Sequence, residues 1–322
     1  MKLILGRTIV LGLLAVSIAA CGGGSGGGSN SGPTAVKTLY VASGDSSSIE
    51  MFSETATGNA SPQATISGSN TTLKLPIGVA VDSSGVIYVA GDEAVKVFAA
   101  GSSGNVAPTR TISGSNTLLA EPEGIAISSS GQVAVGAAGG TTVAIFNETS
   151  SGNVAPVSYF TASGMSNPRG VAFDSNGNLW VTSGNDNAVF EFSASSIAAA
   201  SGGITPVNEI SGTSTQIDYP LGIAVDSTGR IIVGNCYSNT ITIFSSGASG
   251  NATPVAVISG SNTGLVNPFY MALSGDGNFS VGANSVRGPV VTYPCSTTGG
   301  NISPTYSLSS PEFNYPLSVA YH

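Results

Sequence analysis

The same short pattern of apolar residues recurs six times along the chain. Each copy opens with a proline and continues as an extended segment in which small and large apolar residues alternate, as in Pro76-Ile77-Gly78-Val79-Ala80-Val81. The opening prolines are Pro76, Pro122, Pro168, Pro220, Pro268 and Pro316, which gives steps of 46, 46, 52, 48 and 48 residues. A period in this range is typical of propellers, solenoids and other repeat arrays. Because both faces of the segment are apolar, we expect a strand that is covered on two sides.

Three further segments complete each repeat. A turn with Asp or Ser first and Gly fourth follows the opening strand, as in Asp82-Ser83-Ser84-Gly85, and we expect its aspartates to form the turn rather than to catalyse. A second strand follows, and a third ends in an aromatic residue that we assign to the core. These aromatic residues are Phe52, Phe98, Phe146, Phe192, Phe244 and Tyr293. A second recurring proline, such as Pro108, is expected to start a fourth strand on the outer edge, because proline has no N–H for a central ladder.

The two ends of the chain predict that the repeats close into a ring. Residues 38–42 match a second strand that has no first strand before it, whereas residues 316–321 match a first strand with nothing after it. Pairing them completes one blade and removes two exposed strand edges. The sequence therefore predicts an all-β fold over residues 38–322: a six-bladed β-propeller of four-stranded antiparallel blades, closed by pairing of the C-terminal strand with the N-terminal strands.

The N-terminal segment carries a different pattern. Lys2 and Arg7 flank an apolar run that is short for a membrane span and typical of a secretory signal. The run ends in Ile18-Ala19-Ala20-Cys21, which resembles the lipobox of bacterial lipoproteins, where the cysteine becomes lipidated. A plain signal peptide with an incidental cysteine is the alternative.

The leader implies an address in the cell envelope. We expect a signal peptide over residues 1–20, then a lipidated Cys21 with a Gly/Ser-rich flexible tether over residues 21–37. In lipoproteins, a residue such as Gly22 after the cysteine implies transfer to the outer membrane. The propeller would then face the periplasm or the cell surface.

Charge narrows the classes of partner. Without Lys2 and Arg7, the chain has 7 basic and 17 acidic residues and a net charge of −10. An acidic surface repels phosphate groups and no basic stripe is visible, so we expect no nucleic-acid partner.

The repeat resembles the NHL repeat, whose motif runs Pro-x-Gly-Ile-Ala-Val-Asp-x-x-Gly-Asn-Ile-Tyr-Val and ends in a Val-x-Val-Phe strand. Residues 168–192 follow this motif closely, and the resemblance extends over residues 38–322. The resemblance implies the propeller fold but leaves the function open, because the same scaffold carries lyases, lactonases, RNA readers and non-catalytic binding modules.

Histidine content excludes two kinds of active site. Amidating lyases similar to this fold bind a metal through histidines in the central channel, but the only histidine here is His322. A three-histidine zinc site and a Ser-His-Asp triad inside the ring are therefore excluded.

A resemblance to six-bladed gluconolactonases implies the main enzymatic alternative, a calcium-dependent hydrolase. Calcium binds six to eight oxygen ligands, carboxylates among them. The candidate ligands in loops at one mouth of the channel are Asp45, Asp92, Asp186, Asn235 and Asn284, with Glu93, Glu123 and Arg169 nearby. Loop Asp and Asn also occur wherever tight turns form, so a site without metal is the competing interpretation.

The residue after each opening proline forms a ring at the same mouth, namely Ile77, Glu123, Arg169, Leu221, Phe269 and Leu317, with Tyr219, Tyr270 and Tyr315 close by. Such a mixed ring suits a small or peptide-like ligand. The candidate ligand-binding residues are Glu123, Arg169, Leu221, Phe269, Tyr270 and Tyr219. The alternative is that the ring plugs the channel and that Glu123 and Arg169 form an ion pair between neighbouring blades.

Two cysteines lie outside the leader, Cys236 and Cys295. The repeat places them at opposite ends of adjacent blades, about a strand length of 17 Å apart, which exceeds the reach of a disulfide. We therefore expect both thiols to be unpaired.

These observations favour a membrane-anchored, extracytoplasmic, non-catalytic binding or scaffold module without a resident cofactor, whose partner is a protein, a peptide or a glycan. The calcium-dependent hydrolase is the main alternative. A structural surface-layer or adhesion component is the third.

Overall fold

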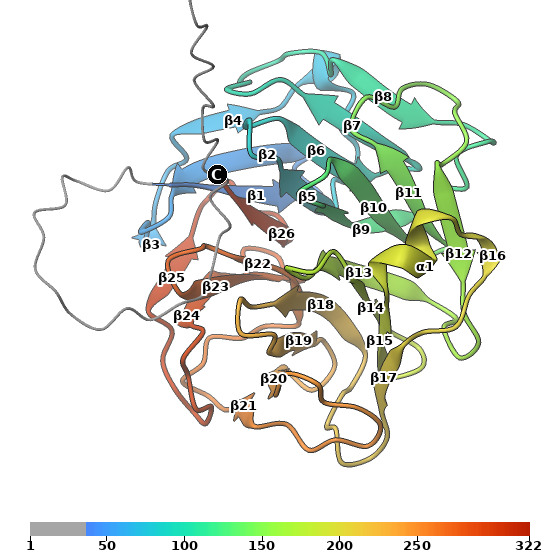
Figure 1. Ribbon diagram of the computed structural model, residues 1–322. Helices are drawn as coiled ribbons and strands as arrows, with labels where there is room; N and C mark the ends of the chain where they lie inside the picture. Colours follow the sequence, from blue (N-terminus) through green and yellow to red (C-terminus); the bar gives the residue numbers. More distant parts are fainter. Residues whose placement is uncertain (1–36) are drawn as a thin grey trace, which may run out of the picture.

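A computed structural model describes residues 37–322 of the chain, and these residues form six β-sheets arranged as blades around a central axis (Figure 1). Blade 1 contains, from the axis outward, β26 (Pro316–Tyr321), β1 (Thr38–Ser43), β2 (Ser48–Ser53) and β4 (Ala64–Ile66). Blade 2 contains β5 (Gly78–Val81), β6 (Ile87–Gly91), β7 (Ala94–Phe98) and β8 (Arg110–Ser113). Blade 3 contains β9 (Pro122–Ile127), β10 (Gln132–Ala137), β11 (Val143–Asn147) and β12 (Ser158–Thr161).

The second half of the ring repeats this order. Blade 4 contains β13 (Pro168–Phe173), β14 (Leu179–Ser183), β15 (Ala188–Phe192) and β17 (Asn208–Ser211). Blade 5 contains β18 (Pro220–Val225), β19 (Ile231–Asn235), β20 (Thr240–Phe244) and β21 (Ala256–Ile258). Blade 6 contains β22 (Pro268–Leu273), β23 (Asn278–Ala283), β24 (Val290–Pro294) and β25 (Tyr306–Ser309). The six-bladed, four-stranded architecture expected from the repeat is confirmed.

The ring closes where the sequence predicts. β26 pairs antiparallel with β1, with Leu39 opposite Tyr321 and Val41 opposite Val319. Thr38 and His322 exchange backbone hydrogen bonds of 2.8 and 3.1 Å. The C-terminal strand therefore becomes the inner strand of the blade that the N-terminal strands begin.

Parallel contacts between neighbouring blades add a second, outer closure. The loop before each outer strand reaches back to the outer strand of the preceding blade, as in the parallel bridges between Ile66 and Gly104 and between Ile112 and Gly152. Two of these loops form short strands, β3 (Gly58–Asn59) beside β25 and β16 (Ser201–Gly203) beside β12. The outer edges are therefore partly covered, which protects them from pairing with other chains.

In the described part of the chain, helical structure is limited to short connections. A 3-10 helix, η1, spans Ser69–Thr71, and one α-helix, α1, spans Ala194–Ala198. The side chain of Ser193 accepts a hydrogen bond from the Ser196 N–H and caps α1. Within residues 37–322, no helix has the length and apolar character needed to cross a membrane.

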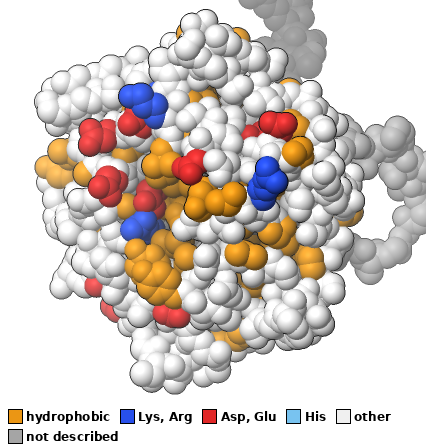
Figure 2. All heavy atoms as spheres, turned by 180° about the vertical axis from the view of Figure 1, so that it is seen from behind, with side chains coloured by type: hydrophobic (Ala, Val, Ile, Leu, Met, Phe, Trp, Pro, Cys, Tyr) orange, Lys and Arg blue, Asp and Glu red, His pale blue; other side chains and the backbone are white. Residues whose placement is uncertain are grey.

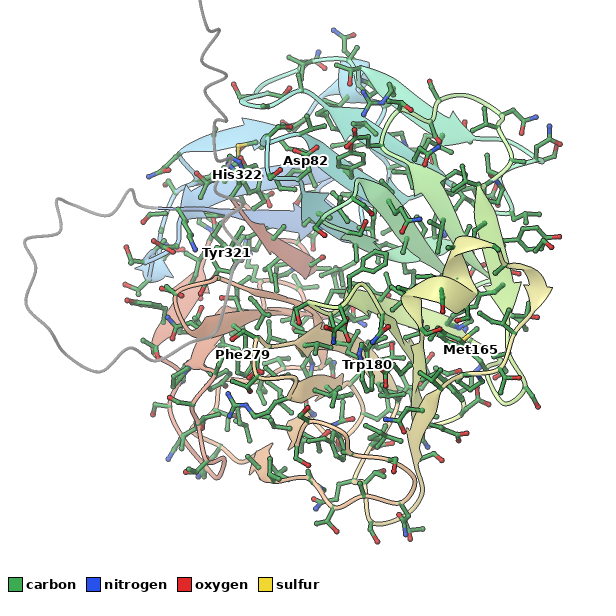
Figure 3. The ribbon with its side chains drawn as sticks, viewed as in Figure 1. Asp82, Met165, Trp180, Phe279, Tyr321 and His322 are labelled. Atoms are coloured by element: carbon green, nitrogen blue, oxygen red, sulfur yellow. The ribbon has the colours of Figure 1, made fainter. Side chains whose placement is uncertain are left out.

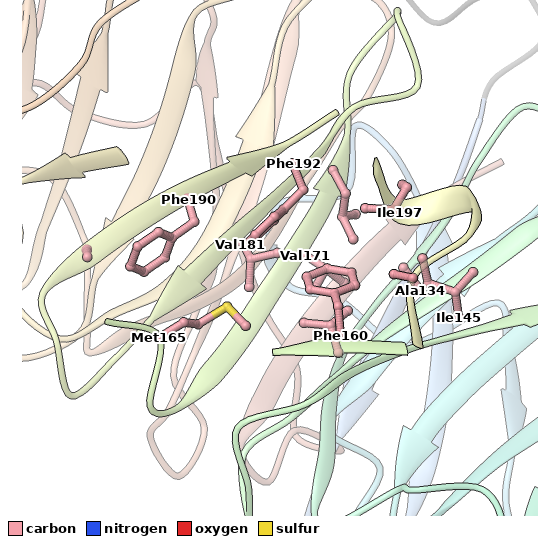
Figure 4. Close-up of a cluster of buried hydrophobic side chains, with 13 residues drawn as sticks. Ala134, Ile145, Phe160, Met165, Val171, Val181, Phe190, Phe192 and Ile197 are labelled. Carbon is pink, nitrogen blue, oxygen red and sulfur yellow. The ribbon is translucent and has the colours of Figure 1, made fainter. Parts of the chain in front are cut away.

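The core lies between the blades. All six aromatic residues at the ends of the third strands are fully buried, as expected, and Trp180 packs among apolar residues of blades 4 and 5. Figure 4 shows one such cluster, in which Phe160 of blade 3 meets Phe192 of blade 4 with ring centroids 4.6 Å apart. Burial of paired aromatic rings between sheets is a large share of the apolar area that stabilises such a ring.

The expected turn-forming role of the aspartates is confirmed at Asp82. The outer strands follow the recurring prolines but begin later than expected. The carboxylate of Asp82 accepts hydrogen bonds from the N–H groups of Ser84 and Val86 in its own turn, so this aspartate forms the turn as expected. The outer strands begin two residues after the recurring prolines rather than at them, as at Arg110 after Pro108. Thr109 already donates to Val97 of the third strand, because it is the first residue after Pro108 that has an N–H.

Candidate ligand-binding face

The inner strands meet closely at the end where they begin with proline. A Cβ atom added to Gly78, Gly124 or Gly170 would lie 2.0 to 2.1 Å from a carbonyl oxygen of the next inner strand. Glycine at the third position of each copy therefore allows the neighbouring backbones to approach. We call this end of the ring the plugged face and the opposite end, where the inner strands finish, the open face.

Tyr270 departs from the glycine pattern and closes the channel. It stands in blade 6 at the position that is glycine in blades 2 to 5, and only 6% of it is exposed. Its hydroxyl donates a 2.7 Å hydrogen bond to Oε2 of Glu123 in blade 3, which lies across the axis. Burial first, and then the charge of Glu123, hold the pKa of Tyr270 well above its usual value. The tyrosine side chain therefore bridges the bore as a neutral donor.

Glu123 and Arg169 form the ion pair between neighbouring blades that the sequence allowed. Nη1 of Arg169 lies 2.5 and 2.6 Å from the two carboxylate oxygens, and the side chains are 17% and 10% exposed. Nε of Arg169 donates to Oδ1 of Asn167 at 2.8 Å, and the Asn167 amide donates to the Ala138 carbonyl at 2.6 Å. Burial acts to lower the pKa of Arg169, but the charge of Glu123 and the bonds to it outweigh burial and raise the pKa. The carboxylate is thus saturated with donors and is not placed to act as a general base.

Two tyrosines extend this network to the surface. Nη2 of Arg169 donates to the Tyr219 hydroxyl at 3.1 Å, and the guanidinium carbon lies 5.6 Å from the centroid of the Tyr219 ring. The Tyr219 ring stacks on that of Tyr237 with centroids 4.2 Å apart and planes within 2°. Tyr237 is 67% exposed, so one face of its ring covers Tyr219 and the other is open to solvent.

Apolar side chains fill the rest of the mouth. Leu221, Phe269, Tyr270 and Leu317 are buried in one cluster with Cys236, and Ile77, Tyr219 and Tyr315 pack against it. Figure 2 views the molecule from this side and shows hydrophobic side chains gathered near the middle, around adjacent acidic and basic groups. The structure thus brings all the candidate ring residues together, as a plug.

The expectation that both cysteines are unpaired is confirmed for Cys236 and wrong for Cys295. Cys236 is free and buried, and burial raises the pKa of its thiol to about 11, so it is un-ionised at neutral pH. Cys295 is also buried but is not free, so the expectation of an unpaired thiol is wrong there. The distance between Cys236 and Cys295 in the repeat excluded a bond between these two thiols, but it did not justify the further prediction that both are unpaired.

The channel remains open at the other face. A cavity of about 250 Å³ is lined by the last residues of the inner strands, including Val81, Ile127, Phe173 and Leu273. Exposure along an inner strand increases in this direction: Val79 is 4% exposed, whereas Ala80 and Val81 are partly exposed. The His322 side chain also lies on this face, beside Ser83 in the Asp82 turn, and Tyr321 lines the cavity (Figure 3).

The calcium candidates are dispersed among the loops of the plugged face. Asp186 accepts hydrogen bonds from Ser166 and Ser183; burial acts to raise its pKa, but these bonds outweigh burial and lower it. Asn235 is fully buried and bonds to Thr240, Thr242 and the Asp218 N–H.

The other candidates lie apart from these. Asp92 lies 3.7 Å from Lys74 in blade 2 and shares its loop with Glu93, whereas Asp45 and Asn284 belong to loops of blades 1 and 6. Within the described part of the chain, no three His, Cys, Asp or Glu side chains are placed to share a metal ion.

Sequence reasoning missed two members of the network. Asn167, which orients Arg169, immediately precedes an opening proline, as Tyr219 and Tyr315 do, so its position was a usable signal. Tyr237 stands in a loop already assigned to the rim, but its stacking on Tyr219 depends on the distance between two loops of blade 5, which the repeat does not encode.

Comparison with known proteins supports the repeat assignment. Residues 218–244, which include the three inner strands of blade 5, match the model of the NHL repeat. This segment is therefore an NHL repeat, in a chain that folds as a six-bladed propeller. A search of curated proteins finds no significant match.

Solved structures share the fold at low sequence identity. A Bacteroides caccae protein of unknown function has a TM-score of 0.64 and 12% identity, covering 89% of this chain and 99% of that one. The WD40 propeller domain of Doa1 has a TM-score of 0.57 and 13% identity, with coverage of 86% and 80%. A chain of the mitotic checkpoint complex has a TM-score of 0.53 and 20% identity, with coverage of 76% and 68%. These likenesses establish the fold alone.

Proposed function

We propose that this NHL-type propeller is a lipid-anchored, extracytoplasmic, non-catalytic binding module whose plugged face receives a protein or peptide partner. The observation that carries the proposal is the closed mouth itself. Glu123, Arg169 and Tyr270 satisfy one another's hydrogen bonds, and apolar side chains fill the remaining space. Such a surface suits docking better than chemistry on a substrate held in the channel.

Exposed apolar side chains support the same face. Among residues 37–322, five of the eight exposed large hydrophobic residues belong to its loops: Leu75, Leu118, Tyr237, Val266 and Val286. Clusters of exposed apolar side chains rimmed by polar residues commonly mark interaction sites. Propellers that share this fold, such as the chain in the mitotic checkpoint complex, occur in multiprotein assemblies, which fits a docking role.

The direction of the tether supports the orientation. β1 begins beside the end of β26, so Lys37 lies on the open face, where its ammonium also bonds the Ser274 carbonyl. An anchor at Cys21, which precedes the described residues, would hold the open face toward the membrane. The plugged face would then point toward partners in the envelope.

Metabolic labelling with an alkyne-bearing fatty acid tests the anchor. We expect the label on the parent protein, together with its recovery in the membrane fraction, and the loss of both in Cys21→Ser. Cys236→Ser is the matched control, because that thiol is buried in the propeller. Labelling of the Cys21→Ser protein, or an unlabelled parent protein, contradicts the anchor.

Selection of peptides from a displayed library tests the docking face. Peptides that bind the soluble Cys21→Ser protein should lose binding when Leu75→Glu places a charge on the plugged face. Val255→Glu is the matched control, because Val255 is more exposed than Leu75 (59% against 47%) but lies on the outer edge of blade 5. Binders that respond to Val255→Glu and not to Leu75→Glu would place the docking surface elsewhere.

Thermal melts with calcium and with chelator test the hydrolase alternative. A bound ion stabilises the native state by about 2.7 kcal/mol at a hundred times its Kd. We expect no shift in the melting temperature of the parent protein. A calcium-dependent increase that Asp186→Ala or Glu123→Ala abolishes would instead favour the enzyme.

A further inference from the structure

The exposed face of the Tyr237 ring is an aromatic platform without an occupant in the described part of the chain. Tyr219 covers one side of the ring at a centroid distance of 4.2 Å, and 67% of the residue is exposed. Tyr219 is fixed in turn by the hydrogen bond from Arg169 and by the bond from its own N–H to Oδ1 of Asn187 at 2.7 Å. The platform is therefore held rigidly, which reduces the entropy lost when a partner stacks on it.

The charged groups around Tyr237 favour a positively charged ligand. The ion pair with Glu123 offsets part of the positive charge that Arg169 brings near the platform. Asp218 adjoins Tyr219, is half-buried, and takes part in none of the three ion pairs among residues 37–322. The Asp218 N–H donates to Oδ1 of Asn235, and the Cys236 N–H donates to the Tyr219 carbonyl, so the segment that carries Asp218 runs beside the segment that leads to Tyr237. A planar cation stacked on Tyr237 would therefore have a free carboxylate at hand.

Acidic groups extend this preference over the whole plugged face. Glu93 and Glu121 are exposed in its loops and are likewise absent from the ion pairs of the described residues. The exposed apolar side chains of Leu75 and Val286 lie on the same face, where Arg287 is the exposed basic residue outside the ion pairs of residues 37–322. The surface is thus complementary to a segment that combines basic and apolar side chains.

We propose that Tyr237 is the docking platform for an arginine side chain in a basic, apolar segment of a partner protein. This inference rests on the proposed function and specifies its partner. Arginine fits better than lysine because its planar guanidinium stacks on an aromatic face while its N–H groups reach a carboxylate, here that of Asp218. Two tyrosine rings and a guanidinium in one stack, with the guanidinium outermost, would bury the platform at the centre of the contact.

Fluorescence polarisation with defined peptides tests this proposal on the full chain carrying Cys21→Ser. The probe is a short acetylated peptide in which arginine alternates with leucine, and the comparison peptides carry lysine or glutamate in place of arginine. We expect binding in the order arginine, lysine, glutamate. Tyr237→Ala should weaken the arginine peptide about two- to fivefold, the range for an exposed cation–π contact.

Matched variants distinguish the platform from the general face. Tyr237→Phe keeps the ring and should retain the arginine preference, whereas Asp218→Asn should reduce it. Val286→Ala, at another exposed position of the same face, should leave the preference for arginine over lysine unchanged. Circular dichroism melts confirm that each variant is folded.

Three outcomes would overturn the proposal. Equal binding of the arginine and lysine peptides, or no effect of Tyr237→Ala on a peptide that Leu75→Glu abolishes, would remove the arginine platform and leave the docking face intact. Binding of neutral oligosaccharides that is lost in Tyr237→Ala, with no peptide binding, would identify a glycan platform instead. Failure of all peptides and all displayed binders would contradict the proposed function as well.

Discussion

Tyr270 shows how one departure from the repeat changes the centre of the molecule. Where four blades have a glycine that lets inner strands approach, blade 6 has a tyrosine whose hydroxyl crosses the bore to Glu123. The same carboxylate receives both bonds from Arg169. Three side chains from blades 3, 4 and 6 therefore close a channel that the regular repeat would leave open.

Removal of Arg169 should be more harmful than removal of the whole ion pair. Arg169→Leu leaves Glu123 buried with an uncompensated charge, which we expect to cost about 3–5 kcal/mol of unfolding free energy. Glu123→Leu combined with Arg169→Leu replaces the pair by apolar side chains and should lose less. Urea unfolding of the two variants measures the difference. A double variant that loses the sum of both single losses would show that the charges act independently.

Glu50 gives the stability an unusual dependence on pH. It is 1% exposed in β2, and burial raises its pKa from 4.5 to about 7, although hydrogen bonds from Ser48 and Ser43 act to lower it. A carboxyl with a higher pKa in the folded state holds its proton longer there, so the stability that it contributes is full below about pH 4.5 and is lost as the pH rises through about 7.

A Glu50→Gln variant isolates this effect. Relative to the variant, the parent protein should lose up to about 3 kcal/mol between about pH 4 and about pH 8. Chemical denaturation over that range measures it, and the difference between the two proteins cancels the other carboxylates. Glu312→Gln should reduce the loss, because the charge of Glu312 contributes to the raised pKa. Parallel pH profiles for parent and Glu50→Gln would contradict the assignment.

At the scale of elements, asparagine side chains join neighbouring blades through hydrogen bonds, and we call these contacts the asparagine clamps. In four places, the side-chain oxygen of an asparagine in the loop before the outer strand accepts an N–H from the turn that ends the preceding blade, at 2.6 to 2.7 Å. The four asparagines are Asn105, Asn153, Asn251 and Asn301. The turn glycines pack against them: Gly114 has φ of 115° and would bring a Cβ to 2.6 Å from Asn153.

Each asparagine clamp that is removed should lower the free energy of unfolding by a similar amount. Asn153→Ala should lower the unfolding free energy by about 0.5–1 kcal/mol, and removal of all four asparagines by about 2–4 kcal/mol, because distant sites add. Gly114→Ala should cost more than Asn153→Ala, since it adds backbone strain to the steric conflict. Urea unfolding measures each loss.

Asn59 offers a matched control for the clamps. It occupies the same position in blade 1, but the turn that it would cap is replaced in blade 6 by Ser310-Pro311. Asn59→Ala should therefore change stability little. An equal loss in Asn59→Ala and Asn153→Ala would show that the asparagines act in the loops and not between blades.

The elements divide into those that the sequence predicts and those that it does not. Alternating apolar residues and the six opening prolines predicted the blades and the aromatic core. They also predicted the meeting of Glu123 with Arg169, because these residues occupy the same position in adjacent repeats. The clamps and the crossing by Tyr270 depend on how far apart neighbouring or opposite blades lie. That distance results from the packing of all six sheets, and no local pattern carries it.

At the scale of the whole molecule, stability depends on strand pairing that closes the ring in two places, one near the axis and one at the outer rim. The pairing of β26 with β1 closes the ring near the axis, and the pairing of β3 with β25 closes it at the rim between the same two blades. Both joints combine segments from opposite ends of the sequence, so their formation requires the whole chain. The ring is therefore expected to unfold as one cooperative unit and not blade by blade.

Removal of β26 tests this cooperativity. Truncation before Pro316 would expose the edge of β1 and uncover apolar residues such as Val41 and Phe52 that pack with β26 and blade 6. We expect the truncated protein to lose its sharp thermal transition and to elute as large assemblies in size-exclusion chromatography, because unpaired edges recruit other chains.

A synthetic peptide of residues 316–322 should restore part of the transition by adding the missing strand. His322→Ala, which keeps the strand and its backbone bonds to Thr38, should behave as the parent protein. A truncated protein that melts as sharply as the parent would show that the rim joint alone holds the ring.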